Sequence, residues 1–316
     1  MLTLLLPFFG LIAIGYAAGF FRLLAPAALA GLETFVAWVA MPVLYFHLIV
    51  TAPAGAIPGL GFVVATAFAT YCTFAVAFSA GALFNGGNVP EATIQGLVGS
   101  YSSAAYLGPP LVLAAFGPGA AAPLGLIVAF ETAVMLLVTP LMMALGGTSR
   151  TDPARLAAGI ARDIGTNPIV IAVILGLIGS AVGLRLPAAV DALLTTLRGG
   201  AIPVALFVFG ASLSARSIGR PSLEVPVAAA VKLVGHPLVV YLLLTWIGGF
   251  PPLWVHTAVV AAALPPAAEV VRMADRYGAW ARPGAQALLV ASYAAVATVT
   301  IVLIVIVSQS ARPLLP

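Results

Sequence analysis

Two charged residues of opposite sign lie three positions apart in an apolar part of the chain. Glu269 and Arg272 follow the pair Pro265-Pro266 in the stretch ALPPAAEVVRMADRYG, residues 263–278. On a helix, side chains at this spacing share one face and can form an ion pair. Charges within a membrane are costly and by default mark a functional site. In one interpretation Arg272 attracts an anion while Glu269 carries a proton or a cation; in the other, Arg272 reaches water at the cytoplasmic end and Glu269 neutralises it.

Further charged residues lie in other apolar segments. Lys232, in VAAAVKLVGHPLVVY, needs a partner or a cavity, and both a structural ion pair and a substrate contact are open for it. Glu131, in LIVAFETAVML, is a second buried carboxylate that could titrate or accept hydrogen bonds from a broken backbone. Both are expected to support a polar site. Glu33 and Asp191 fall near the ends of their segments and are interpreted as interfacial.

A second proline pair follows a group of hydroxyl side chains in GSYSSAAYLGPPLVLAAFG. Serine hydroxyls in such segments often only satisfy carbonyl groups of their own helix. They can also line a binding site where the helix is interrupted. The candidates for this second part of the site are Ser102, Ser103, Tyr106, Gly108, Pro109 and Pro110.

Residue types that bind metals or perform acid–base chemistry are sparse. His47, His236 and His256 show no ligand spacing, and the one cysteine, Cys72, excludes an internal disulfide and a cysteine metal cage. No two aspartates share an apolar segment, and no histidine has a nucleophile near it in sequence, so an intramembrane enzyme is not expected. We predict no metal site and no cofactor, with coupling to a proton or to Na+ left open.

The elements that position these residues are predicted to be membrane-spanning helices. The 316 residues are 62% hydrophobic and 7% charged, with a mean hydropathy of +1.16. Continuous apolar runs of about 20 residues are typical of transmembrane helices, whereas a barrel would alternate with period two. The runs predict an all-α polytopic membrane protein with ten spans, at 3–22, 29–50, 57–83, 91–117, 121–146, 166–183, 188–213, 223–248, 253–278 and 283–308.

Positive charges orient these spans. No Lys or Arg precedes the first apolar run, which is therefore interpreted as a span rather than a signal peptide. A cytoplasmic central loop puts most loop arginines inside, namely Arg22, Arg150, Arg155, Arg162, Arg216, Arg220, Arg276 and Arg282, and leaves Arg185 and Arg312 outside. This bias predicts a multi-pass protein of the inner (plasma) membrane with both termini outside. Since the net charge of +4 comes from scattered arginines, nucleic acid is not expected as a partner.

Prolines occur at matching positions in the two halves of the chain. Pro7 matches Pro168 and Pro42 matches Pro203 at one common offset, and the two proline pairs fall in the fourth span of each half. Five spans per half invert the second copy relative to the first, which is the plan of many secondary transporters. We expect a first repeat over 1–148, a cytoplasmic linker over 149–165 and a second repeat over 166–316.

The proline pairs predict where helices break. Proline lacks an amide donor and clashes with the preceding turn, so two in succession interrupt a helix. In lipid such a break survives only inside protein or beside a water-filled cavity. We expect spans four and nine to break near their middle, at Pro109-Pro110 and Pro265-Pro266, and to cross near the membrane midplane, where half-helix N-termini suit an anion. The alternative is that each pair only kinks its helix.

Several stretches of the chain resemble a known family. They are MPVLYFHL, NPIVIAVILGLI, IPVALFVFGASL and KLVGHPLVVYLLL, together with YLGPPL and LPPAAEVVRMADRYG in the crossover spans. In their order and spacing they resemble the bacterial auxin efflux carrier family, which is related to plant PIN-type carriers and to the bile acid/sodium symporter superfamily. That family includes transporters of malonate and other organic acids. The resemblance covers essentially the whole chain.

The resemblance implies a fold and a mechanism. Spans one, two, six and seven would form a scaffold, often dimeric, and spans three to five and eight to ten a transport domain that moves in an elevator-like way. A small organic anion would bind where spans four and nine cross. Ser103 stands where the family usually has Asn, Glu269 where it has an amide, and Arg272 where it has an apolar residue. The added cation favours a dicarboxylate, whereas the added carboxylate favours cation coupling.

The expected function is therefore a secondary carrier of a small organic anion in the lipid bilayer. The alternative is a sodium-coupled, bile-acid-type symporter with Glu131, Glu269 and crossover carbonyls as Na+ ligands. A homodimer through the scaffold helices is possible, because small residues let helices approach closely.

Overall fold

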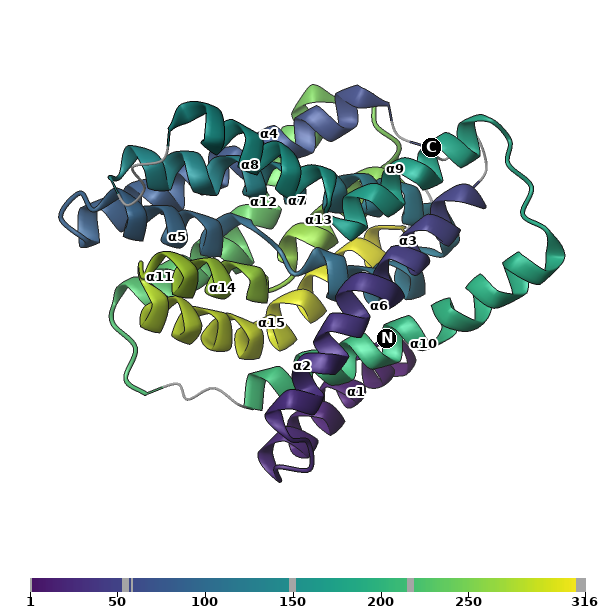
Figure 1. The fold of residues 1–316 in the computed structure, drawn as a ribbon, viewed down its shortest axis with the longest axis horizontal. Helices are drawn as coiled ribbons and strands as arrows, with labels where there is room; N and C mark the ends of the chain where they lie inside the picture. The colour runs from purple at the N-terminus through teal and green to yellow at the C-terminus, as the bar shows by residue number, and fades with distance from the viewer. Residues whose placement is uncertain (1, 53–56, 58, 148–151, 215–218, 311–316) are drawn as a thin grey trace.

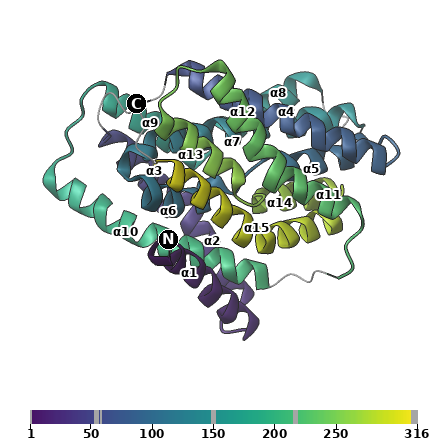
Figure 2. The same cartoon turned by 180° about the vertical axis from the view of Figure 1, so that it is seen from behind.

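The computed structural model describes residues 2–52, 57, 59–147, 152–214 and 219–310 (Figures 1 and 2). Within these ranges the chain forms helices and one isolated antiparallel bridge, between Ser102 and Pro266. The predicted all-helical class is confirmed. Arg150, Arg216 and Arg312, used to orient the spans, lie outside the described residues.

The first half of the chain holds helices α1 to α7. In order they are α1 (Leu2–Phe20), α2 (Pro26–Phe35), α3 (Met41–Val50), α4 (Leu60–Phe84), α5 (Val89–Ser100), α6 (Ala104–Phe116) and α7 (Ala121–Leu145). A π-helical turn, Val36–Ala40, joins α2 to α3 without a break, so that Pro26–Val50 is one span. A 3-10 turn, Pro118–Ala120, leads into α7.

The second half holds helices α8 to α15. They are α8 (Pro153–Gly165), α9 (Pro168–Ala181), α10 (Ala188–Ser214), α11 (Glu224–Ala230), α12 (His236–Ile247), α13 (Pro252–Ala263), α14 (Ala268–Tyr277) and α15 (Ala281–Ser310). A second π-helical turn, Val231–Gly235, joins α11 to α12. It carries Lys232, whose position is described below.

Six helical stretches among the described residues are long and apolar enough to cross a membrane. They are Pro26–Val50, Leu60–Phe84, Pro118–Leu145, Ala188–Ser214, Glu224–Ile247 and Ala281–Ile306. The pair α8 and α9, bent by 60° at its junction, gives a seventh if counted as one span. The chain is therefore a multi-pass membrane protein, while the ten-span arrangement stays a prediction.

The predicted linker is not simply a loop. From Pro153 to Gly165 it forms α8, an amphipathic helix that places Ile160 against the protein and packs on α7. Its arginines lie on the polar side, where they can meet water or lipid headgroups.

Helices α1, α3, α9 and α10 form one packed group. α1 runs along α10, and α3 packs on both α9 and α10 (Figure 1). The contact between α1 and α10 is close enough to require glycine. A Cβ at Gly15 would clash with the backbone carbonyl of Phe207, and one at Gly210 with that of Ile12. The two backbones therefore touch directly, as in other small-residue contacts between membrane helices.

Gly15→Ala should therefore destabilise the protein, whereas Gly10→Ala should not. Both lie on α1, but nothing stands within 4 Å of a Cβ at Gly10. Overpacking at Gly15 is expected to cost about 1–3 kcal/mol, because α10 must move away. Thermal unfolding of the two variants in detergent measures the difference. Equal melting temperatures would show that the two backbones do not touch at Gly15.

Candidate functional site

Two interrupted helices meet through their backbones. α5 ends at Ser100 and α6 begins at Ala104, while α13 ends at Ala263 and α14 begins at Ala268. The amide of Ser103 donates to the carbonyl of Pro265 at 2.8 Å, and the amide of Ala267 donates to the carbonyl of Tyr101 at 3.2 Å. Each non-helical segment thus satisfies backbone groups of the other, which is the condition for a break at membrane depth.

The break in the second of these helices lies where the prolines predicted it. Pro265 and Pro266 stand between α13 and α14, in the bridge with Ser102.

In the other helix the predicted break was wrong. It falls at residues 101–103, before the proline pair, and Pro109 and Pro110 lie inside α6. Pro109 has no amide to offer the carbonyl of Ala105 four residues earlier. The hydroxyl of Tyr45, on α3, donates to that carbonyl at 3.0 Å. A side chain from another helix therefore supplies the donor that proline lacks, and α6 continues.

This shift relocates the predicted site residues. Ser102 and Ser103 lie within the break, almost fully buried, and Tyr106 is in the first turn of α6. Gly108 lies one turn further along, where a Cβ would crowd Leu124 of α7. Gly108 and Pro109 are therefore packing positions of α6, whereas Ser103 and Tyr106 face a cavity.

Glu269 and Arg272 form the predicted ion pair at the start of α14. Arg272 Nη2 donates to Glu269 Oε1 at 2.7 Å. The Arg272 side chain is 57% exposed and that of Glu269 20% exposed. The guanidinium is thus accessible from the cavity beside it, and part of its hydrogen-bonding capacity is open to a ligand.

A cavity of about 340 Å³ surrounds this pair. Ser103, Tyr106, Glu269 and Arg272 line it from the two interrupted helices, and Trp38 lines it from the π-helical turn between α2 and α3. A neighbouring cavity of about 250 Å³ is lined by the same five residues and extends towards Asn167 and α9. The first turns of α6 and α14 border this space, and helix N-termini carry partial positive charge.

Sequence reasoning missed a charged residue of this cavity. Glu33, interpreted as interfacial, lines the cavity with Arg272 and accepts a hydrogen bond from Ser212 Oγ of α10 at 2.6 Å. The cavity therefore holds two carboxylates and one guanidinium. The position of this acidic residue, five residues into a predicted apolar span, was the sequence signal that could have identified it.

Lys232 contacts both interrupted helices and is fully buried. Its ammonium donates to Ser102 Oγ at 2.6 Å and to the carbonyl of Ala262 at 2.7 Å, and lies 2.8 Å from His236 Nδ1. Three partners account for the three N–H groups of an ammonium. Of the two interpretations open for Lys232, the geometry fits a residue that supports the crossing.

Glu131 connects to Lys232 through two side chains. Its Oε1 accepts from Thr70 Oγ1 at 3.1 Å, and Thr70 Oγ1 lies 3.2 Å from His236 Nε2. Thr70 is on α4 and His236 on α12. The partner of Glu131 is therefore a hydroxyl group rather than the broken backbone. Thr70 was not a sequence candidate, and His236 was considered only as a metal ligand.

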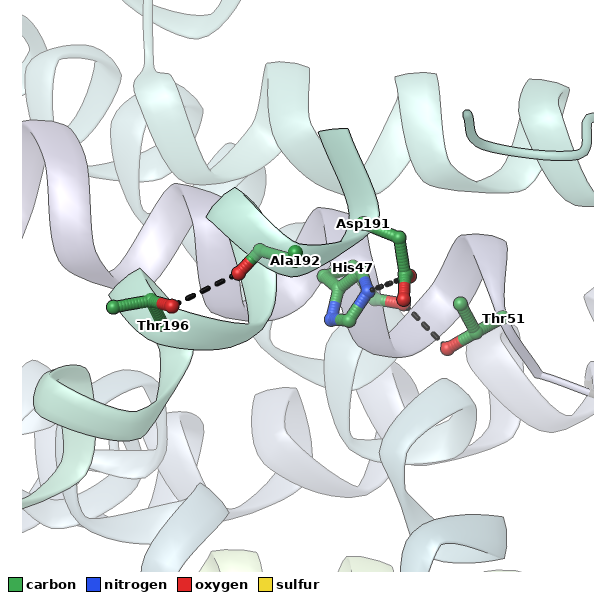
Figure 3. Close-up of polar contacts among 5 residues, drawn as sticks. All are labelled: His47, Thr51, Asp191, Ala192 and Thr196. Atoms are coloured by element: carbon green, nitrogen blue, oxygen red, sulfur yellow. Dashed lines mark hydrogen bonds and ion pairs between the residues drawn. The ribbon is translucent and has the colours of Figure 1, made fainter. Parts of the chain in front are cut away.

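A separate side-chain contact joins α3 to α10 (Figure 3). His47 Nε2 lies 2.8 Å from Asp191 Oδ1, with His47 buried and Asp191 half exposed. The interpretation of Asp191 as interfacial left out this contact. Across the described ranges no three His, Cys, Asp or Glu side chains are placed to hold a metal ion.

Comparison with known proteins assigns the chain to a family. The family model described as "Membrane transport protein" matches residues 1–304. A protein of Rhizobium meliloti (strain 1021), named "Putative malonate transporter", is 37% identical over 297 residues, which cover 94% of this chain and 93% of the relative. The chain therefore belongs to the membrane transport protein family, which is the auxin efflux carrier family that its crossover motifs resemble.

Proposed function

We propose that the protein is a secondary transporter of a small dicarboxylate of the malonate type, bound at the crossing of the two interrupted helices. The observation that carries this proposal is the accessible guanidinium of Arg272 at the start of α14, facing a cavity bordered by two helix N-termini. Family membership and the name of the Rhizobium meliloti relative point to the same class of solute.

Two features of the cavity can each bind one negative group of a ligand. One carboxylate would take the free side of the Arg272 guanidinium, which binds carboxylates in a two-point geometry. The second would meet the start of α6, where Ser103 and Tyr106 line the cavity and the helix dipole is positive. A volume of about 340 Å³ leaves room for water around so small a substrate.

Glu269 gives this site a means of coupling to protons. A substrate carboxylate and the Glu269 carboxylate compete for one guanidinium, and Glu33 adds a second negative charge to the same cavity. Protonation of Glu269 would remove the competition and release Arg272. Binding of the anion would then take up a proton, and the two would cross the membrane together.

The sodium-coupled alternative has less support. It needs Glu131 and Glu269 as ligands of one ion, yet the two carboxylates line different cavities. Glu131 lines a small cavity of about 30 Å³ with Thr70 and Tyr101, while Glu269 is held by Arg272 in the large one. The crossover carbonyl of Ala262 is already occupied by Lys232.

We also propose that transport follows an elevator-like motion of two inverted five-span repeats. α1, α2–α3, α9 and α10 would be the scaffold, and the helices that carry the crossing would move against it. The close packing of α1 on α10 and of α3 on α9 and α10 supports a common scaffold. The antiparallel contact of the two breaks supports an inverted relation. Both termini would lie outside, and a homodimer would form through the scaffold.

The first prediction concerns Arg272. Purified protein should be stabilised against heat by malonate, and Arg272→Ala should weaken malonate binding at least about tenfold, the worth of a charge-assisted hydrogen bond. Arg276→Ala is the matched control, because Arg276 lies on the same helix but lines a different cavity. Neither change should lower the free energy of unfolding by more than about 1 kcal/mol, since the Arg272 pair is exposed.

A panel of mono- and dicarboxylates, measured by thermal shift, identifies the substrate class. If malonate binds Arg272→Ala as tightly as the unchanged protein, Arg272 is only the structural partner of Glu269. The anion site would then lie elsewhere.

The second prediction concerns Glu269. Malonate binding should take up a proton, and should tighten as the pH is lowered within the range where malonate keeps both charges. Glu269→Gln should bind malonate without proton uptake and without this pH dependence, because Arg272 is then permanently released. Calorimetry in two buffers of different ionisation enthalpy measures the uptake. Proton uptake that persists in Glu269→Gln would transfer the coupling role to another group.

A further inference from the structure

The C-terminal ends of the interrupted helices carry a different chemistry from their N-terminal ends. α5 ends at Ser100 and α13 at Ala263, on the side of the crossing that holds Lys232. Helix C-termini are negative and have carbonyl groups without partners. In carriers with broken helices, such carbonyls are the usual ligands of a coupling Na+.

Pro266 leaves one of these carbonyl groups without a helical donor. The carbonyl of Ala262 would be paired four residues later with Pro266, which has no amide hydrogen. Lys232 Nζ donates to it at 2.7 Å, and donates to Ser102 Oγ, in the other break, at 2.6 Å. One ammonium therefore binds both interrupted helices with oxygen contacts, as a metal cation at this place would.

The charge of the ammonium is balanced inside the protein. His236 accepts at Nδ1, its Nε2 lies against Thr70, and Thr70 donates to Glu131. Lys232, His236, Thr70 and Glu131 come from α4, α7 and the α11–α12 segment and form one connected network, in which all but the partly buried Thr70 are buried. A fully buried cation in a membrane persists only with such compensation. Glu131 is thus the counter-charge of Lys232.

We propose that Lys232 is a built-in cation of the crossing, which takes the place of a coupling Na+ and frees substrate binding from any need for sodium. Its removal opens a site for a small monovalent cation between Ser102 Oγ, the Ala262 carbonyl and His236 Nδ1, with Glu131 as the counter-charge beyond His236 and Thr70. This inference rests on the proposed carrier function, because it concerns the same crossing. Lys232 acts as a positioning residue: it holds the two breaks together from behind and does not touch the substrate cavity.

The experiment compares Lys232→Ala with Lys232→Met in NaCl, LiCl and choline chloride at equal ionic strength, without malonate. The unchanged protein should melt at the same temperature in all three salts. Lys232→Ala should melt lower in choline and regain several degrees in Na+ or Li+, in a saturable way. Lys232→Met is the matched control, since its apolar chain fills the space of the lysine and should leave no response to the cation.

A second measurement separates a cation site from a general loss of stability. Malonate affinity of the unchanged protein should be equal in NaCl and in choline chloride. In Lys232→Ala it should become at least tenfold tighter in NaCl than in choline. A merely structural loss would lower stability equally in every salt and would not produce this cation selectivity.

Several outcomes would overturn the proposal. They are saturable stabilisation of the unchanged protein by Na+, a sodium requirement for its malonate binding, or equal behaviour of Lys232→Ala in all salts. A different result would contradict the proposed carrier function. An unchanged protein that ignores every carboxylate, while Lys232→Ala still responds to Na+, would remove the proposed substrate and leave the cation site intact.

Discussion

The structure depends on two backbone hydrogen bonds between segments that are far apart in sequence. Ser103 donates to Pro265, and Ala267 donates to Tyr101. In hydrocarbon an unpaired backbone group costs several kcal/mol, because no water can replace the missing partner. Neither interruption could exist without the other, and each half of the chain therefore needs the other to satisfy its backbone.

Two prolines leave backbone carbonyl groups without their helical donors, and long side chains from other helices supply the missing donors. Pro109 leaves the carbonyl of Ala105 without its helical donor, and Tyr45 supplies one. Pro266 has no amide for the carbonyl of Ala262, and Lys232 supplies the donor. In both cases the donor comes from a different helix. Buried polar side chains in this protein are therefore part of the backbone pairing as well as candidates for function.

Helix ends of opposite polarity lie on the two sides of the crossing. Two helix N-termini border the cavity that holds Arg272 and Glu269, while two C-termini lie towards Lys232. Positive helix ends thus border the cavity on one side, and negative helix ends lie towards the Lys232 side chain on the other. Under the proposed function, this arrangement would place the substrate anion beside positive helix ends and the lysine cation beside negative ones. Glu33 and Glu131 add a carboxylate to each side.

The sequence by itself determined the helical membrane class, the break at Pro265-Pro266, the pairing of Glu269 with Arg272 and, through its motifs, the family. These features follow from local rules: apolar length, missing amide donors and spacing along one helix. Only the tertiary structure decided that α6 continues through Pro109, that Glu33 joins the cavity, and that Lys232 reaches Glu131 through His236 and Thr70. The reason is that these outcomes depend on partners from other helices, whose approach no local pattern encodes.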